Sequence, residues 1–223
     1  MSKRAIFLSG KRGGGASGPT TTTTTTTWQV SASGDDGWAS HSTSGTFFNA
    51  NQSSVVAGFY VAGGSTTVGT YGFFRFTGVE IPQGATIDTA KLTLVTSPAP
   101  LGAEYGDLDL HTFKVDALDV DDSAQPSSAT DANDSVASTE AIVDWSLTSS
   151  VADDADLDTP EIKTVVQEIV DRGGWAADND MTFRVYSEET DSSNVLTPDC
   201  RLNVQTHDLD SDNAAKLVVT YTA

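Results

Sequence analysis

Short stretches in which apolar and other residues alternate constrain the fold of this chain more than any other feature. Between residues 181 and 186, Met181, Phe183 and Val185 alternate with Thr, Arg and Tyr. A period of two places one set of side chains on one face of a β-strand. Similar stretches recur between clusters of Gly, Asp, Asn and Ser. The sequence predicts strands at 28–32, 46–49, 55–61, 71–77, 86–96, 107–118, 141–147, 181–187, 201–206 and 216–221.

Two irregularities interrupt this pattern. Leu108 and Leu110 have one parity and Phe113 and Val115 have the other, which predicts a β-bulge near His111. The stretch 119–138 is rich in Asp, Ser and Ala and has no strand pattern, so we interpret it as an insertion, long enough to be mobile or to serve as a contact.

One helix is predicted, at about 159–172. Thr159 can cap it, Pro160 suits its first position, and Gly173 can adopt the left-handed conformation that ends it. Its apolar positions follow the spacing of one buried stripe: Ile162, Val165, Val166, Ile169 and Val170. About ten strands and one helix predict an all-β fold, a jelly-roll β-sandwich whose helix covers one edge or end of a sheet.

The first 27 residues differ from the rest in composition. Residues 10–18 are rich in Gly, and eight threonines follow at 20–27. Glycine makes a chain flexible, whereas β-branched threonine favours extended conformations. The sequence therefore predicts two parts, an extended anchoring arm at 1–27 and a jelly-roll sandwich at 28–223.

Charge divides the chain at nearly the same place. No acidic residue precedes Asp35, and residues 1–34 carry four basic residues, a net of +4. The other 189 residues carry 8 basic and 31 acidic side chains, a net of −23, so the total is −19. A body of this charge repels nucleic acid and anionic membranes. The sequence contains no run of about 18 apolar residues, so we do not expect membrane insertion. We expect the arm to bind a protein partner through Lys3, Arg4, Ile6, Phe7, Leu8, Lys11, Arg12, Thr20, Thr22, Thr24 and Thr26.

Catalytic motifs are not recognisable in the sequence. His41, His111 and His207 stand apart from any nucleophile or metal pattern, so we expect no enzyme activity. Calcium is the one cofactor with candidate ligands, because it binds carboxylate oxygens, although solvated acidic turns are the commoner outcome. The calcium candidates are Asp153, Asp154, Asp156 and Asp158. Trp38 and Trp175 are candidates for stacking on a carbohydrate, although tryptophan more often fills a core.

Three segments together resemble a known kind of domain. They are 74–87, which contains the sequence IPQGATI; 159–175, which contains VVQEIVDRGGW; and 215–221, AKLVVTY. They are similar to the jelly-roll domains of the carbohydrate-binding-module-like, DNRLRE-related kind. Such domains occur in surface proteins of bacteria and archaea and in structural proteins of tailed viruses. The resemblance implies the fold and carries over no binding residue.

These observations lead to one expected function and one alternative. We expect a non-enzymatic structural protein on the outer surface of the virion of a tailed bacteriophage or archaeal virus. It would be a capsid decoration, neck or tail-attached protein, held by residues 1–27 to other virion proteins. We further expect a homo-oligomer, with a host-surface glycan as a further candidate ligand. The alternative is a carbohydrate-binding module of a cell-surface or secreted protein.

Overall fold

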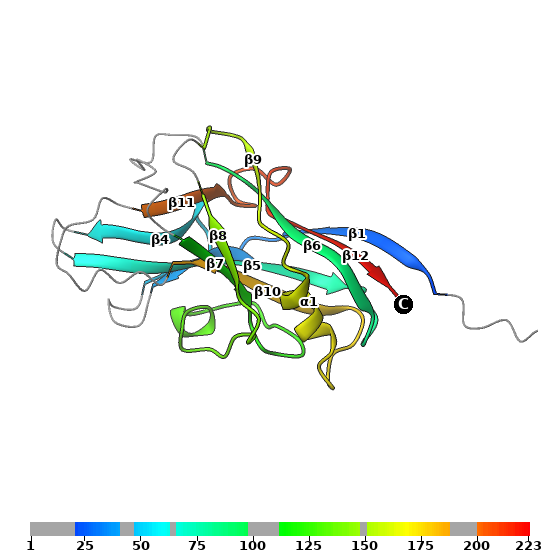
Figure 1. Ribbon diagram of the computed structural model, residues 1–223. Helices are drawn as coiled ribbons and strands as arrows, with labels where there is room; N and C mark the ends of the chain where they lie inside the picture. The colour runs from blue at the N-terminus through cyan, green and yellow to red at the C-terminus, as the bar shows by residue number, and fades with distance from the viewer. Residues whose placement is uncertain (1–20, 41–46, 63–65, 98–111, 148–150, 188–199) are drawn as a thin grey trace, which may run out of the picture.

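The computed structural model describes residues 21–40, 47–62, 66–97, 112–147, 151–187 and 200–223. These residues form two antiparallel β-sheets and one α-helix (Figure 1). The predicted all-β sandwich is confirmed. Phe74, Phe76 and Phe183 of one sheet and Leu92 and Leu217 of the other belong to the same buried core cluster. No helix among these residues is long and apolar enough to cross a membrane.

The smaller sheet has four strands in the order β1-β12-β6-β9. Their bounds are Thr23–Gln29 (β1), Lys216–Thr222 (β12), Thr86–Val95 (β6) and Asp156–Asp158 (β9).

The larger sheet has eight strands, six of them in the order β11-β4-β5-β10-β7-β8; β2 pairs with β5 and with β3. Their bounds are Cys200–Gln205 (β11), Ser54–Ala62 (β4), Thr66–Val79 (β5), Asn179–Tyr186 (β10), Thr112–Ala117 (β7), Val143–Ser146 (β8), Asp36–Ser40 (β2) and Phe48–Asn49 (β3).

The expected start of the sandwich at Trp28 is wrong. Strand β1 begins at Thr23, and five of the threonines assigned to the arm pair with the C-terminal strand β12. Residues 28–32 alternate well enough to predict a strand. The strand begins five residues earlier because Thr23–Thr27 also pair with β12. Strands β2 and β9 were not predicted, because their Asp residues are typical of turns. The proposed bulge near His111 lies outside the described residues.

Helix α1 spans Lys163–Val170, and the predicted stripe of five apolar residues is buried. Its start differs from the prediction. The Oγ1 of Thr159 accepts a hydrogen bond from the N–H of Leu92 on β6, 3.0 Å away, instead of capping the helix. The helix ends at Asp171 with φ −79°, and Gly173 does not have a positive φ. The start was misplaced because the hydroxyl of Thr159 has a partner outside the helix.

Helix α1 covers one edge of the four-stranded sheet, as predicted. Gln167 Oε1 accepts a hydrogen bond from the N–H of Ile87 (2.8 Å), and Glu161 Oε1, just before the helix, accepts one from Ala90 (2.6 Å). Strand β9 pairs with β6 only from Thr93 to Val95. Side chains from the helical segment therefore satisfy the part of β6 that β9 leaves open.

The segment 119–138 packs on the outer face of the eight-stranded sheet. Ala129 and Ala132 form a second buried cluster with Ala39 of β2 and Phe73 of β5. Asn133 is buried and donates a hydrogen bond from Nδ2 to the carbonyl of Ser40, 3.0 Å away. The segment is thus a packed cover of the sheet.

Candidate functional site at the edge of β1

Strand β1 is the terminal strand of the four-stranded sheet, and its position makes it a candidate binding site. It pairs antiparallel with β12 in one continuous register, from Thr23 opposite Thr222 to Gln29 opposite Lys216. Figure 1 shows no described element on its other side. A row of backbone N–H and C=O groups therefore faces away from the described sheet.

The hydrogen bonds at the two ends of β1 identify which residues face outward. Thr22 and Ala223 exchange two backbone hydrogen bonds, of 2.9 and 3.1 Å, and Val30 donates one to Ala215 at 3.0 Å. Hydrogen-bonded and non-hydrogen-bonded pairs alternate along an antiparallel ladder. Even-numbered residues of β1 therefore direct their backbone groups to β12. The odd-numbered residues Thr23, Thr25 and Thr27 direct theirs outward.

The side chains of these outward-facing residues are exposed and uncharged. The hydroxyl of Thr23 lies 2.9 Å from that of Thr222, and the hydroxyl of Thr25 lies 2.8 Å from that of Thr220. These contacts lie between non-hydrogen-bonded pairs, where side chains of neighbouring strands are closest. The threonine ladder therefore fixes β1 to β12 while its other edge stays unpaired within the described part of the chain.

The predicted arm residues have two different outcomes. Those at 3–20 lie outside the described residues, which leaves the expected basic and apolar contacts as predictions: Lys3, Arg4, Ile6, Phe7, Leu8, Lys11, Arg12 and Thr20. The expected use of Thr22, Thr24 and Thr26 for pairing with a partner backbone needs correction, because their N–H and C=O groups face β12. The sequence could not distinguish odd from even positions, since every residue in 20–27 is threonine.

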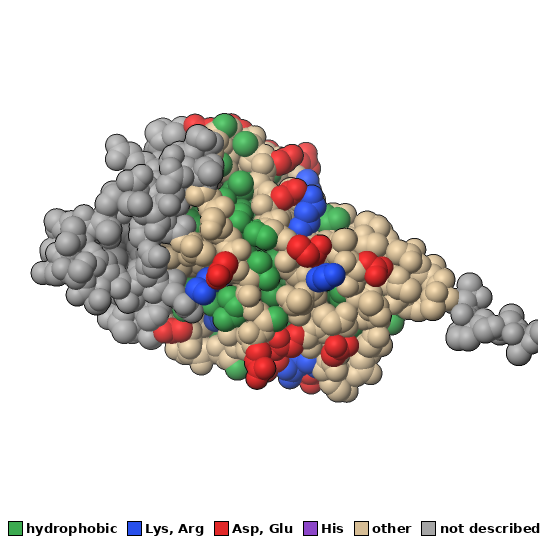
Figure 2. Space-filling view, viewed as in Figure 1, with side chains coloured by type: hydrophobic (Ala, Val, Ile, Leu, Met, Phe, Trp, Pro, Cys, Tyr) green, Lys and Arg blue, Asp and Glu red, His purple; other side chains and the backbone are tan. Residues whose placement is uncertain are grey.

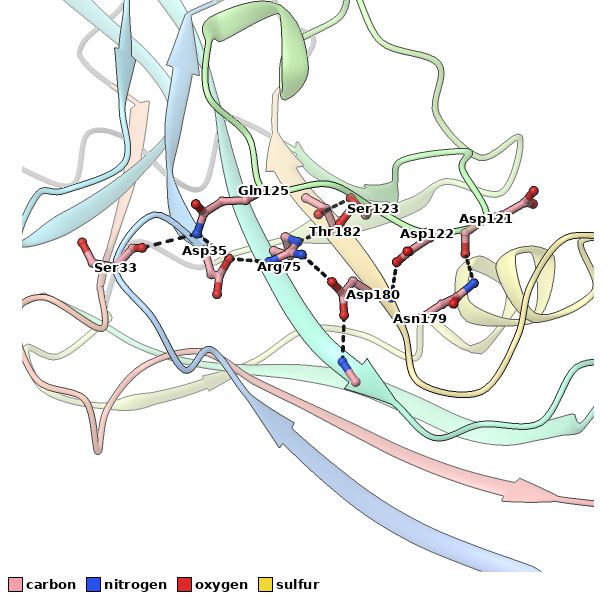
Figure 3. Close-up of polar contacts among 11 residues, drawn as sticks. Ser33, Asp35, Arg75, Asp121, Asp122, Ser123, Gln125, Asn179, Asp180 and Thr182 are labelled. Atoms are coloured by element: carbon pink, nitrogen blue, oxygen red, sulfur yellow. Dashed lines mark hydrogen bonds and ion pairs between the residues drawn. The ribbon is translucent and has the colours of Figure 1, made fainter.

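A polar cluster centred on Arg75 joins three segments of the larger sheet and its cover (Figure 3). The Nη1 of Arg75 donates to Asp35 Oδ1 at 2.7 Å, and its Nε donates to the carbonyl of Ser123 at 2.7 Å. Its Nη2 pairs with Asp180, whose Oδ1 accepts the N–H of Gly78 at 2.8 Å. The three nitrogens of the Arg75 guanidinium thus have partners inside the fold. Because one of these partners is the carbonyl of Ser123, the cluster holds the segment 119–138 on the sheet.

A second ion pair lies deeper, on the same outer face. Arg184 of β10 binds both carboxylate oxygens of Asp116 on β7, at 2.8 and 2.6 Å, and also the carbonyl of Asn133 at 2.5 Å. Both side chains are buried, and the guanidinium lies 5.0 Å from the ring centroid of Tyr71. The buried positions of these charges were not predicted from the sequence. Their signal was an arginine within an apolar strand, as in Phe74-Arg75-Phe76 and Phe183-Arg184-Val185.

Asp36 of β2 is a fully buried carboxyl group without a neutralising cation among its described neighbours. Its Oδ2 accepts the N–H of His207 at 2.9 Å, and its Oδ1 has no hydrogen-bond partner. Burial raises the pKa of Asp36 to about 7, and the nearby carboxylates of Asp208 and Asp35 add to the increase. At neutral pH this group is close to the midpoint of its titration.

The candidate calcium ligands do not converge. Asp154 Oδ1 accepts a hydrogen bond from Gln205 at 2.8 Å, whereas Asp158 pairs with Lys91 at 2.5 Å. Asp156 and Asp158 are exposed residues of β9. No group of three or more His, Cys, Asp or Glu side chains in the described ranges could hold a metal ion. The structure therefore gives no calcium site at Asp153, Asp154, Asp156 and Asp158.

The candidate carbohydrate-stacking residue Trp175 is buried in the core. It is 3% exposed, and its Nε1 donates to the carbonyl of Ile81 at 2.9 Å. A ring that is covered on both faces cannot stack on a sugar, so this expectation is corrected. Trp38 of β2 is half-buried and pairs through its backbone with Asn49 and Gly72.

An open hollow of about 400 Å³ lies beside the segment 119–138, where Leu118, Val120 and Val136 form part of its wall. The polar residues in the same wall have partners: Asp131 accepts the N–H of Ser127 at 2.9 Å, and the hydroxyl of Ser123 lies 2.7 Å from that of Thr182. Those polar groups are therefore engaged within the cover or with β10 beneath it.

The described residues form a β-sandwich whose smaller sheet has one edge covered and the other open among them. The chain matches no protein-family model and no curated protein sequence. Among solved structures, a chain titled Desmodium yellow mottle tymovirus is similar over 99% of this chain and 92% of its own length, with 11% identity and a TM-score of 0.26. A similarity of this size carries no argument for function. The resemblance to carbohydrate-binding-module-like domains stays a prediction from sequence.

Proposed function

We propose that this chain is a non-enzymatic structural protein of a virus particle, of a tailed bacteriophage or an archaeal virus. Its sandwich would be displayed on the outer surface as a capsid decoration, neck or tail-attached protein. Residues 1–20 would fasten it to another virion protein. The observation that carries the proposal is the division of charge, +4 in residues 1–34 against −23 in the remainder.

The geometry of the chain ends supports this division of labour. Thr22 and Ala223 exchange backbone hydrogen bonds at one end of the four-stranded sheet, so residues 1–20 join the described fold at that end. The described charged clusters support it in another way. Arg75 and Arg184 form ion pairs with carboxylates outside the cover. Both arginines also donate hydrogen bonds to backbone carbonyls of the cover, which is a structural use of charge. Recognition of a partner is then left to the arm and the surface.

The proposal is tested by deleting residues 1–18 and measuring incorporation into particles. The deletion ends before Thr22, so β1 keeps its whole ladder with β12. Particles assembled with the truncated chain should contain little or none of it by quantitative mass spectrometry. Circular dichroism and the melting temperature of the truncated chain should stay close to those of the full chain.

A charge-reversed full chain tests whether the basic residues, rather than the length of the arm, are needed. Replacing Lys3, Arg4, Lys11 and Arg12 by Glu keeps the length of the arm and removes its attraction to an acidic partner. Incorporation should fall in this variant as well. Normal incorporation of the truncated chain, or absence of the full chain from purified particles, would overturn the proposal.

A further inference from the structure

Within the described residues, the open edge of β1 lacks the features that usually prevent two sheets from joining. Proteins protect edge strands with charged residues, proline, bulges or a covering element. Residues 21–27 are all threonine, and the register with β12 contains no bulge. The opposite side of the same sheet is protected, since Glu161 and Gln167 occupy the free N–H groups of β6. Side chains thus cover backbone groups at one side of the sheet, whereas the described residues cover none at the edge of β1.

We propose that a second copy of this chain binds at this edge, with the two β1 strands antiparallel about a two-fold axis at Thr25. Thr25 would then lie opposite Thr25 of the second copy, and Thr23 opposite Thr27. These are the residues whose backbone groups face outward. Three such pairs, each exchanging two hydrogen bonds, supply about six inter-chain hydrogen bonds and join two four-stranded sheets into one.

Self-complementarity favours a second copy over another occupant. A two-fold axis at Thr25 places threonine against threonine at every outward position, so no side chain clashes in size or charge. The exposed hydroxyls of Thr23 and Thr25 bond to those of Thr222 and Thr220 across the non-hydrogen-bonded pairs of β1 and β12. Between chains these threonines would lie in hydrogen-bonded pairs, so the backbone groups, rather than the hydroxyls, would supply the contact.

Charge also selects this surface for contact between copies. Two bodies of net charge −23 repel each other, and the repulsion is weakest where the approaching surfaces carry no carboxylate. Figure 2 shows few charged side chains at the end of the molecule where β1 and β12 lie. Backbone pairing needs no charged partner group.

The fold also limits the length of the contact. The side-chain amide of Gln29 donates to the carbonyls of Ser211, Asp212 and Ala214, each at 3.0 Å, so the turn at 211–214 lies beside the end of β1. The exposed edge therefore runs from Thr23 to Thr27, and we expect a reversible dimer rather than a permanent one.

The test is sedimentation equilibrium of the full chain and two variants of Thr25. Thr25→Ala and Thr25→Pro both lose the hydroxyl that contacts Thr220, but only proline removes the outward N–H and places its ring on the edge. The wild type and Thr25→Ala should dimerise reversibly, more tightly as salt screens the bodies. Thr25→Pro should weaken the dimer by more than about tenfold.

A cysteine pair tests the register even if Thr25→Pro folds poorly. In a Cys200→Ser background, Thr25→Cys should form a disulfide-linked dimer with copper–phenanthroline and dissolved oxygen as the oxidant, because residues in a hydrogen-bonded antiparallel pair lie within disulfide range. Thr24→Cys should not, since Thr24 would lie opposite Thr26 of the second copy, which leaves the two introduced thiols too far apart for a disulfide. A monomeric wild type, equal dimerisation of Thr25→Pro, or association that weakens with salt and is lost on deletion of residues 1–18 would each overturn the proposal.

Discussion

At the residue scale, this fold buries charged groups that a sandwich of its size does not need for its core. The apolar sides of β5, β7 and β10 fill the space between the sheets, while Arg75, Asp116 and Arg184 lie on their outer faces under the segment 119–138. A buried ion pair adds little to stability relative to apolar residues, but removing one member leaves an uncompensated charge. These residues therefore specify where the cover binds.

Replacing Arg184 by Ala should lower the free energy of unfolding by about 3–5 kcal/mol, because Asp116 would stay buried without its partner. Urea denaturation followed by tryptophan fluorescence measures the change. The double variant with Asp116→Ala should lose less than the sum of the two single losses. Lys114→Ala is the control: its bond to Asp144 is largely solvent-exposed on the Asp144 side, so the loss should stay below about 1 kcal/mol. Equal losses at Arg184 and Lys114 would contradict this account.

Asp36 should make the stability of the protein depend on pH. Its pKa of about 7 in the folded state exceeds the ordinary 3.8, so the folded protein holds a proton that the unfolded chain releases. This stabilisation is present below about pH 4 and is lost as pH rises through 7. The loss for a shift of this size is at most about 4 kcal/mol. Asp36→Asn should flatten the decrease between pH 5 and 8 in denaturation midpoints, and an unchanged pH profile would refute the assignment.

At the element scale, the two edges of β1 differ: one pairs with β12, and the other is open among the described residues. The edge that faces β12 closes the four-stranded sheet, and Trp28 anchors the strand through its Nε1, which donates to the carbonyl of Gly78 at 3.1 Å. On the far side of the sheet, helix α1 takes the place of a neighbouring strand, because its Gln167 side chain accepts the N–H of Ile87 on β6. The boundary between arm and sandwich therefore lies near Thr22, not at residue 27.

Deletion of residues 1–27 should destabilise the protein far more than deletion of residues 1–18. The longer deletion removes most of β1 and exposes β12 as a new edge, whereas the shorter one leaves the ladder intact. We expect a fall in melting temperature of more than about 5 °C for the longer deletion and less than about 2 °C for the shorter one. Differential scanning calorimetry measures both. Similar melting temperatures would mean that β1 is dispensable.

At the scale of the whole molecule, the two sheets differ in how their surfaces are used. The eight-stranded sheet is covered on its outer face by the segment 119–138, which the Arg75 and Arg184 clusters hold in place. The four-stranded sheet presents a threonine edge at one side and a helix at the other. An acidic body with one uncharged edge suits assembly at high local concentration, because repulsion disfavours contact at the remaining charged surfaces.

The sequence by itself determined the features that depend on local pattern. Period-two alternation predicted β6, β10, β11 and β12 to within about two residues, and the apolar stripe predicted the buried face of α1, since burial of one face requires that pattern whatever the partner. Only the tertiary structure decided pairing and phase. Nothing within eight identical threonines tells which edge of β1 meets β12, and nothing near Thr159 shows that its hydroxyl binds β6 instead of capping the helix. The pairing and the phase depend on residues distant in the chain, so the local sequence does not predict them.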